Sequence, residues 1–279
     1  MSIRMRIILP AALAAIGCAK EAPPVADVVS EPQQVTITAT DYGYVLPAAP
    51  IHAGLTTITL VNNGQELHHM QLVHLAEGKT VADLSAAIAD GKMPPEWAAE
   101  AGGPNGALPG STANATLILE PGLYALYCRI PSPDGVSHLA KGMVIGMEVQ
   151  PATGPVAALP PGDIQMGLFD YGFSMSPTPA AGAHTFYVTN QATQPHEVVL
   201  VKLEPGATMA PWTDWLKGGM KGPPPGMPFA GLTDIDPGDA QSFTATLEPG
   251  TYGLICFVPD AGDGAPHVLH GMSTTFTVM

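Results

Sequence analysis

Two cysteines are each followed, at nearly the same spacing, by a histidine and a methionine. The two series are Cys128, His138 and Met143, and Cys256, His267 and Met272. One more histidine lies about 60 residues before each cysteine, at His68 and at His196. A thiolate holds Cu(I), imidazole binds both oxidation states, and a distant thioether adjusts the potential. The two sets therefore predict two copper sites that exchange single electrons, with no catalytic residue assigned.

Two simpler explanations of these cysteines have to be weighed. Exported proteins often form disulfides, and a buried cysteine can merely fill a core. A Cys128–Cys256 disulfide would require equivalent positions of two repeats to face each other. Core filling does not explain why His and Met follow twice. Strand parity places Tyr124, Leu126 and Cys128 on one face, so the thiol ends an inward-facing row.

The chain repeats itself with an offset of 128 or 129 residues. Asp41–Tyr44 recurs as Asp170–Phe173, and Leu119–Tyr124 recurs as Leu247–Tyr252. A constant offset indicates a duplicated domain. We predict one domain over residues 33–150, another over 163–279, and a linker rich in Pro, Gly and Ala over 151–162.

Short alternating strands separated by Gly, Pro and Asn dominate each repeat. The strands expected in the first are 35–40, 57–61, 70–75, 115–119, 123–128 and 143–149; those in the second are 185–189, 197–203, 242–247, 251–257 and 273–278. One short helix is expected in each, at 81–89 after the N-cap Thr80 and at 210–216. This pattern predicts an all-β protein of two tandem Greek-key β-sandwich domains, each with a short helical insert.

The histidine pair before the first cysteine requires a choice. Aligned backward from Leu75 and Leu203, His68 matches His196, while His69 matches Glu197. His68 is therefore the expected ligand, and His69 is expected on the opposite strand face, in solvent or as a group near the metal. His270 occupies the position of Lys141, close to the second site. It too is expected in solvent or as a group near the metal. Three histidines without counterparts are expected at the surface: His52, His74 and His184.

The N-terminus is typical of an export signal. Arg4 and Arg6 precede a short apolar run that ends at Cys18, and the run is too short to span a bilayer. Residues 13–18 resemble a bacterial lipobox, which implies a signal peptide over 1–17, lipidation of Cys18 and a tether over 18–32. The alternative is an ordinary cleaved signal that takes Cys18 with it. We expect an exported protein, periplasmic or at the cell surface, held to the membrane by a lipid.

The formal net charge of −14 limits the partners. Nucleic-acid binding needs a basic face to replace phosphate counterions, so this class is disfavoured. A redox partner protein with a basic docking face would be attracted over long range. The sequence does not determine the oligomeric state.

The order His68, Cys128, His138, Met143 and its copy resemble the cupredoxin family, which includes plastocyanins, azurins, halocyanins and the type 1 domain of copper nitrite reductases. The resemblance covers both repeats nearly end to end. It implies two type 1 (blue) copper ions per chain, with the first His opening a strand, Cys ending the next-to-last strand, and the second His and Met on the loop before the final strand. The Cys-to-His loops are longer than those of small plastocyanin-like proteins.

Three functions fit this resemblance. The favoured one is electron transfer outside the cytoplasm by a protein that is not an enzyme. A copper-handling lipoprotein without redox turnover would use the same ligands. A two-domain copper oxidase or nitrite reductase is less favoured, because such enzymes usually place a His beside the type 1 Cys for a further copper. Here Arg129 and Phe257 follow the two cysteines.

Overall fold

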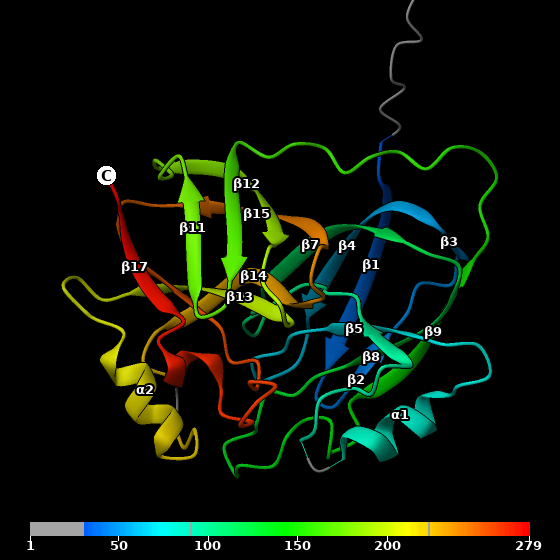
Figure 1. Ribbon diagram of the computed structural model, residues 1–279, viewed down its shortest axis with the longest axis horizontal. Coiled ribbons are helices and arrows are strands. Elements are labelled where there is room, and N and C mark those ends of the chain that lie inside the picture. Colours follow the sequence, from blue (N-terminus) through cyan, green and yellow to red (C-terminus); the bar gives the residue numbers. More distant parts are fainter. Residues whose placement is uncertain (1–30, 90, 223) are drawn as a thin grey trace, which may run out of the picture.

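The computed structural model describes residues 31–89, 91–222 and 224–279, and its regular secondary structure is almost wholly β-strand (Figure 1). The predicted signal peptide, Cys18 and nearly all of the predicted tether lie outside the described residues. Within the described part of the chain, neither α-helix has the length and apolar character needed to cross a membrane.

The described residues of the first repeat form nine strands and one helix. They are β1 (Gln33–Thr40), β2 (Gly43–Val45), β3 (Ile51–His52), β4 (Gly54–Asn62), β5 (Gln71–Leu75), α1 (Val81–Ile88), β6 (Ala98–Glu100), β7 (Thr112–Leu119), β8 (Gly122–Tyr127) and β9 (Val144–Gln150). The side chains of β1 alternate, with Val35, Ile37 and Ala39 buried, as expected for a strand with one face on a core.

The second repeat follows residues 151–162, which contain no helix or strand. Its elements are β10 (Ile164–Phe169), β11 (Gly172–Ser176), β12 (Gly182–Asn190), β13 (His196–Leu203), α2 (Ala210–Lys217), β14 (Met227–Ile235), β15 (Ala240–Leu247), β16 (Gly250–Ile255), the 3₁₀ helix η1 (His267–His270) and β17 (Ser273–Val278). The domain bounds predicted from sequence stay a prediction.

Three sheets form the layers of the molecule. An eight-stranded sheet runs through both repeats in the order β11-β10-β12-β15-β7-β4-β1-β2. A five-stranded sheet, β3-β9-β8-β5-β6, belongs to the first repeat, and a four-stranded sheet, β14-β13-β16-β17, belongs to the second. Buried side chains from all three sheets form one connected core. The expected all-β sandwich arrangement with one short helix per repeat is confirmed.

The two repeats join at two places. At the centre of the long sheet, β15 pairs antiparallel with β7, and Asn114 of β7 exchanges side-chain hydrogen bonds with the main chain of Thr244. Elsewhere, residues 101–105 of the first repeat run along β14 of the second, with Ala101 opposite Ile235 and Pro104 opposite Leu232. Both junctions use main-chain hydrogen bonds, so the repeats are fixed relative to each other.

The repeated Leu-Glu-Pro-Gly-x-Tyr motif closes the turn before the strand that leads to each cysteine. The hydroxyl of Tyr124 accepts the N–H of Glu120 at 3.0 Å, and the hydroxyl of Tyr252 accepts the N–H of Glu248 at 3.0 Å. Both tyrosines are buried. The motif therefore fixes the start of β8 and of β16, and each strand ends one residue before its cysteine.

The helices cover the outer faces of the two smaller sheets. The side chain of Thr80 accepts the N–H of Asp83, and the Asp83 side chain accepts the N–H of Thr80, which forms a capping box at the start of α1. Leu84 and Ile88 of this helix are buried. In the second repeat, α2 buries Trp212 against the core of its own sheet.

Two candidate metal centres

The first centre brings together three side chains from separate parts of the first repeat. One donor atom each from His68, Cys128 and His138 lies within 4.8 Å of the other two, and all three residues are fully buried. The Nδ1 atoms of the two histidines are 3.0 Å apart, and the Cys128 Sγ lies 3.4 Å from the His138 Nδ1. The donor atoms therefore converge on one point.

The second centre repeats this arrangement. His196, Cys256 and His267 are fully buried, and their donor atoms also lie within 4.8 Å of one another. The Cys256 Sγ lies 3.7 Å from the His196 Nδ1 and 3.3 Å from the His267 Nδ1. Among the described residues, Cys128 and Cys256 form no disulfide. If the cysteines only filled the core, two histidines would not be expected beside each of them in both repeats.

Local structure explains how each candidate ligand reaches its centre. His196 opens β13, whereas His68 lies three residues before β5 and is held by main-chain hydrogen bonds to Ala107. The cysteines come directly after β8 and β16. The loop histidines are anchored by main-chain hydrogen bonds to the methionines, from Met143 to His138 at 2.9 Å and from Met272 to His267 at 3.0 Å.

The two methionines are placed beside the cysteines. The carbonyl of Met143 accepts the N–H of Cys128 at 3.3 Å, and that of Met272 accepts the N–H of Cys256 at 3.2 Å. Both methionine side chains are fully buried. Cysteine, histidine and methionine of each loop are thus tied into one unit, which suits the expected weak axial role of the thioether.

Carboxylates hold the outer nitrogens of the histidines in the first centre. The Nε2 of His68 lies 3.0 Å from Asp41, and the Nε2 of His138 lies 2.8 Å from Glu66. Burial raises the pKa of Glu66, but hydrogen bonds from His138, Ser132 and Tyr42 outweigh it and hold this pKa below its ordinary value. An anionic acceptor at Nε2 keeps the proton there and leaves Nδ1 free to bind a metal.

The second centre differs at one of these contacts. Asp170 lies 3.1 Å from the Nε2 of His196, as Asp41 does in the first centre. Glu66, however, is replaced by Gln194, and the carboxylate of Asp260 lies 3.8 Å from the Nε2 of His267. That nitrogen is buried without a hydrogen-bond partner among the described residues.

Burial keeps both centres neutral without a metal. It raises the pKa of the Cys128 thiol to about 12 and that of the Cys256 thiol well above its ordinary value. It also lowers the pKa of His267 to about 4. Neutral imidazoles are ready to coordinate, whereas each thiol must lose its proton to become a ligand. Two imidazoles, a buried thiol and a buried thioether form a donor set that fits copper.

The prediction that His69 lies in solvent is wrong. His69 does point away from the candidate metal centre, but it is buried, and it lines the cavity between the repeats together with Glu197 and Trp212 of the second repeat. Its Nε2 accepts the main-chain N–H of Arg129 at 2.7 Å. Burial, followed by the charge of Arg129, lowers the pKa of His69 to about 3, so the ring is neutral.

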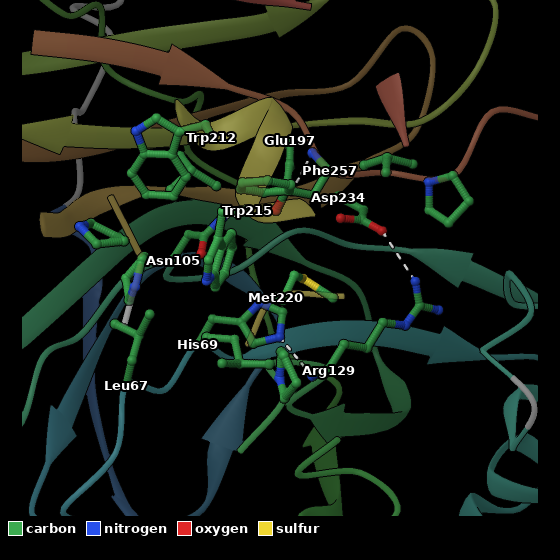
Figure 2. Close-up of a pocket in the computed structure, with 18 of the residues that line it drawn as sticks. Leu67, His69, Asn105, Arg129, Glu197, Trp212, Trp215, Met220, Asp234 and Phe257 are labelled. Atoms are coloured by element: carbon green, nitrogen blue, oxygen red, sulfur yellow. Dashed lines mark hydrogen bonds and ion pairs between the residues drawn. The ribbon is translucent and has the colours of Figure 1, made fainter. Parts of the chain in front are cut away.

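A buried polar cluster and a cavity lie where the repeats meet, beside both centres (Figure 2). The carboxylate of Glu197 accepts hydrogen bonds from the N–H of Phe257 at 2.8 Å and from the Asn105 side chain at 2.9 Å. The cavity has a volume of about 220 Å³, and His69, Glu197 and Trp212 are among its lining residues. Figure 2 shows Arg129 reaching Asp234, with 3.7 Å between the charged atoms.

The remaining histidines occupy varied positions. His52 is exposed, while His74 and His184 are partly buried; His74 stacks on Tyr124 at 4.6 Å between ring centroids, and His184 lies 2.6 Å from Asp163. His270 is partly exposed and contacts Asp263 at 3.2 Å. It does not bond to a ligand of the second centre in the described structure.

Sequence reasoning missed the carboxylates behind the histidines. Asp41 and Asp170 open the repeated Asp-Tyr-Gly motif, which was visible but had no role assigned. Glu66 has no acidic counterpart in the second repeat, so the repeat gave no signal for it.

Comparisons with models of known protein families and with curated proteins found no match. Among solved structures, a reduced auracyanin from Roseiflexus castenholzii is 19% identical, covering 44% of this chain and 100% of its own, with a TM-score of 0.30. Auracyanin A, a blue copper protein from Chloroflexus aurantiacus, is 18% identical over 43% of this chain and 100% of its own, with a TM-score of 0.32. A copper nitrite reductase from Nitrosomonas europaea is 14% identical over 89% and 94%, with a TM-score of 0.25. With identities and TM-scores this low, the case for function rests on the residues of the two centres.

Proposed function

We propose that the chain binds two type 1 copper ions, one in each repeat, and carries electrons outside the cytoplasm. The observation that supports this most is the duplicated convergence of two histidine Nδ1 atoms and one buried thiol, with a buried methionine tied to the same loop. Copper supplies the one-electron couple. The protein orients the imidazoles through their Nε2 contacts and excludes water from the centre.

Burial favours electron transfer over copper handling. All six His and Cys ligands have no exposed surface, and a rigid enclosed ligand set changes little between oxidation states. A protein that passes its metal to an acceptor needs ligands that the acceptor can reach. We therefore place the storage or transfer of copper second.

An enzymatic role has less support. Arg129 and Phe257 follow the two cysteines, so neither position supplies a ligand for a further copper. The cavity between the repeats contributes one histidine, His69, and its Nε2 is already occupied by a main-chain N–H. More than two coppers per chain together with turnover of nitrite or a phenol would overturn this part of the proposal.

The cellular setting is also proposed. The export signal and Cys18 support a periplasmic or surface protein with a lipid anchor, and the charge of −14 supports a basic redox partner. Membrane association that is lost in a Cys18→Ala variant would support the anchor, whereas unchanged association would contradict it.

Spectroscopy of single-site variants tests the copper assignment. Copper-loaded protein is expected to show an intense thiolate-to-copper absorption band and a type 1 EPR signal. Cys128→Ser and Cys256→Ser should each remove part of both signals, and the double variant should remove all of them. A band that survives in the double variant would show that the sites are misassigned.

A further inference from the structure

Position 66 and its counterpart 194 differ beside two centres whose three buried His and Cys residues have the same arrangement. Counting from each cysteine, Glu66 corresponds to Gln194, and Ser132 corresponds to Asp260. The acidic side chain therefore precedes the first histidine of the centre in the first repeat, whereas it follows the cysteine in the second. In the first repeat it hydrogen-bonds to the metal-binding histidine, whereas in the second repeat it does not.

The contact in the first centre is a charge-assisted hydrogen bond. The Glu66 Oε2 lies 2.8 Å from the His138 Nε2, within ordinary hydrogen-bond distance. Its Oε1 accepts a hydrogen bond from the Tyr42 hydroxyl at 2.9 Å, and Ser132 also hydrogen-bonds to this carboxylate. The Oε2 atom is directed at the imidazole, which becomes a stronger donor.

The carboxylate in the second centre is farther away and is engaged elsewhere. The Asp260 Oδ2 lies 3.8 Å from the His267 Nε2, too far for a hydrogen bond. The same oxygen accepts hydrogen bonds from Tyr171 at 2.6 Å and Gln194 at 3.0 Å. Its Oδ1 accepts the N–H groups of Gly262 and Asp263.

A cation beside the first centre acts in the opposite direction. Lys141 contacts the Tyr42 hydroxyl at 3.2 Å, but it also forms an ion pair with Asp134 at 2.8 Å. Asp134 therefore partly neutralises the charge of Lys141 and weakens its electrostatic effect on His138. The direct Glu66–His138 hydrogen bond is the stronger influence, because it acts on a ligand without an intervening group.

We propose that Glu66 makes the first centre the lower-potential site, so that an electron shared between the two centres resides mainly on the second. An anion on the ligand imidazole stabilises the more highly charged, oxidised state of the site. This inference rests on the proposed function, because it presupposes two redox-active centres. It makes the first repeat the electron donor and the second the acceptor within one chain.

Single-centre proteins allow the two potentials to be measured separately. Cys256→Ser retains only the first centre, and Cys128→Ser retains only the second. Spectroelectrochemical titration at one pH should give the lower potential for the first centre. Glu66→Gln in the Cys256→Ser protein should raise that potential by at least about 59 mV, which is a tenfold change in a one-electron equilibrium constant. It should also weaken Cu(II) binding by about 10- to 100-fold.

A control of equal charge change is available on the same repeat. Glu120→Gln removes an exposed carboxylate in the turn before β8, at the end of this strand that lies roughly 20 Å from Cys128 at the rise of a strand. It should leave the potential almost unchanged. If Glu120→Gln changed the potential as much as Glu66→Gln, the cause would be the net charge of the protein and not the Glu66–His138 hydrogen bond. That result would overturn the proposal.

The reverse exchange tests the inference in the second centre alone. Gln194→Glu with Asp260→Ser, in the Cys128→Ser protein, recreates the first repeat's arrangement in the second. Its potential should fall. Equal potentials in the two single-centre proteins, or a fall in potential for Glu66→Gln, would refute the proposed asymmetry. Absence of the thiolate-to-copper band would instead refute the proposed function.

Discussion

His69 and Glu197 occupy equivalent positions in the two repeats, and each accepts a hydrogen bond from the main-chain N–H of the residue that follows its cysteine. The distances are 2.7 Å to Arg129 and 2.8 Å to Phe257. Each side chain directly follows a histidine of a candidate metal centre in the sequence and turns into the interface between the repeats. The junction of the repeats thus also braces the main chain at both centres.

Glu197 should make the stability of the metal-free protein depend on pH. Burial, followed by the charge of Asp234, raises its pKa from 4.5 to about 8. Between these values the folded protein keeps a proton that the unfolded chain has released, so the free energy of unfolding falls as the pH rises. The contribution is at most about 1.4 kcal/mol per pH unit. Denaturant unfolding between pH 5 and 8 measures the slope.

The slope should become shallower in Glu197→Gln, which retains the side-chain size without the ionisable group. Glu204→Gln, at an exposed position of the same repeat, serves as the control and should leave the slope of the unfolding free energy against pH unchanged. An unchanged slope in Glu197→Gln would assign the pH dependence to other groups.

Two asparagines that cross between the repeats should differ in their contribution to stability. Asn105→Ala removes the buried donor to Glu197 and should cost about 1–3 kcal/mol, because the buried carboxyl loses a partner that water cannot fully replace. Asn114→Ala removes hydrogen bonds to Thr244 at a more exposed place and should cost less than about 1 kcal/mol. Equal losses in chemical denaturation would contradict this account of the interface.

The choice between adjacent histidines can be tested in the Cys256→Ser protein, where only the first centre reports. His68→Gln removes a nitrogen that converges with the His138 Nδ1 at 3.0 Å and should abolish the thiolate-to-copper band. His69→Gln should retain the band, because His69 faces the interface. Loss of the band in His69→Gln alone would reverse the assignment.

Copper binding should release protons. Because burial raises the pKa of Cys128 to about 12 and lowers the pKa of the ligand histidines, a neutral solution holds a thiol beside neutral imidazoles. Thiolate coordination then releases about one proton per centre, and the apparent affinity rises about tenfold per pH unit. Calorimetry in buffers of different ionisation enthalpy counts the protons. If close to zero protons were released per copper bound, the cysteine would not be a copper ligand.

The sequence predicted those parts of the sites that depend on local order. Cysteine, histidine and methionine follow one another on a single loop, so their spacing alone placed them together. The N-cap at Thr80 is equally local and correctly predicted the start of α1. The assignment of these residues as copper ligands stays a prediction.

Features created by contact between distant segments could not be predicted in this way. His69 alternates out of the first core and would be solvated in an isolated domain, but the second repeat covers it. Strand β14 contains Pro228 and Gly231, which disfavour strands. It forms because β13 and residues 101–105 supply hydrogen-bond partners on both sides. The Glu66–His138 contact joins residues 72 positions apart.

Anomalous diffraction at the copper edge, from crystals of the copper-loaded protein, tests the central claim most directly. Two copper peaks per chain are predicted. One should be bound by the Nδ1 atoms of His68 and His138 and the Sγ of Cys128, and the other by the corresponding atoms of His196, His267 and Cys256. Copper located elsewhere, or either cysteine sulfur outside bonding distance of its peak, would contradict the account.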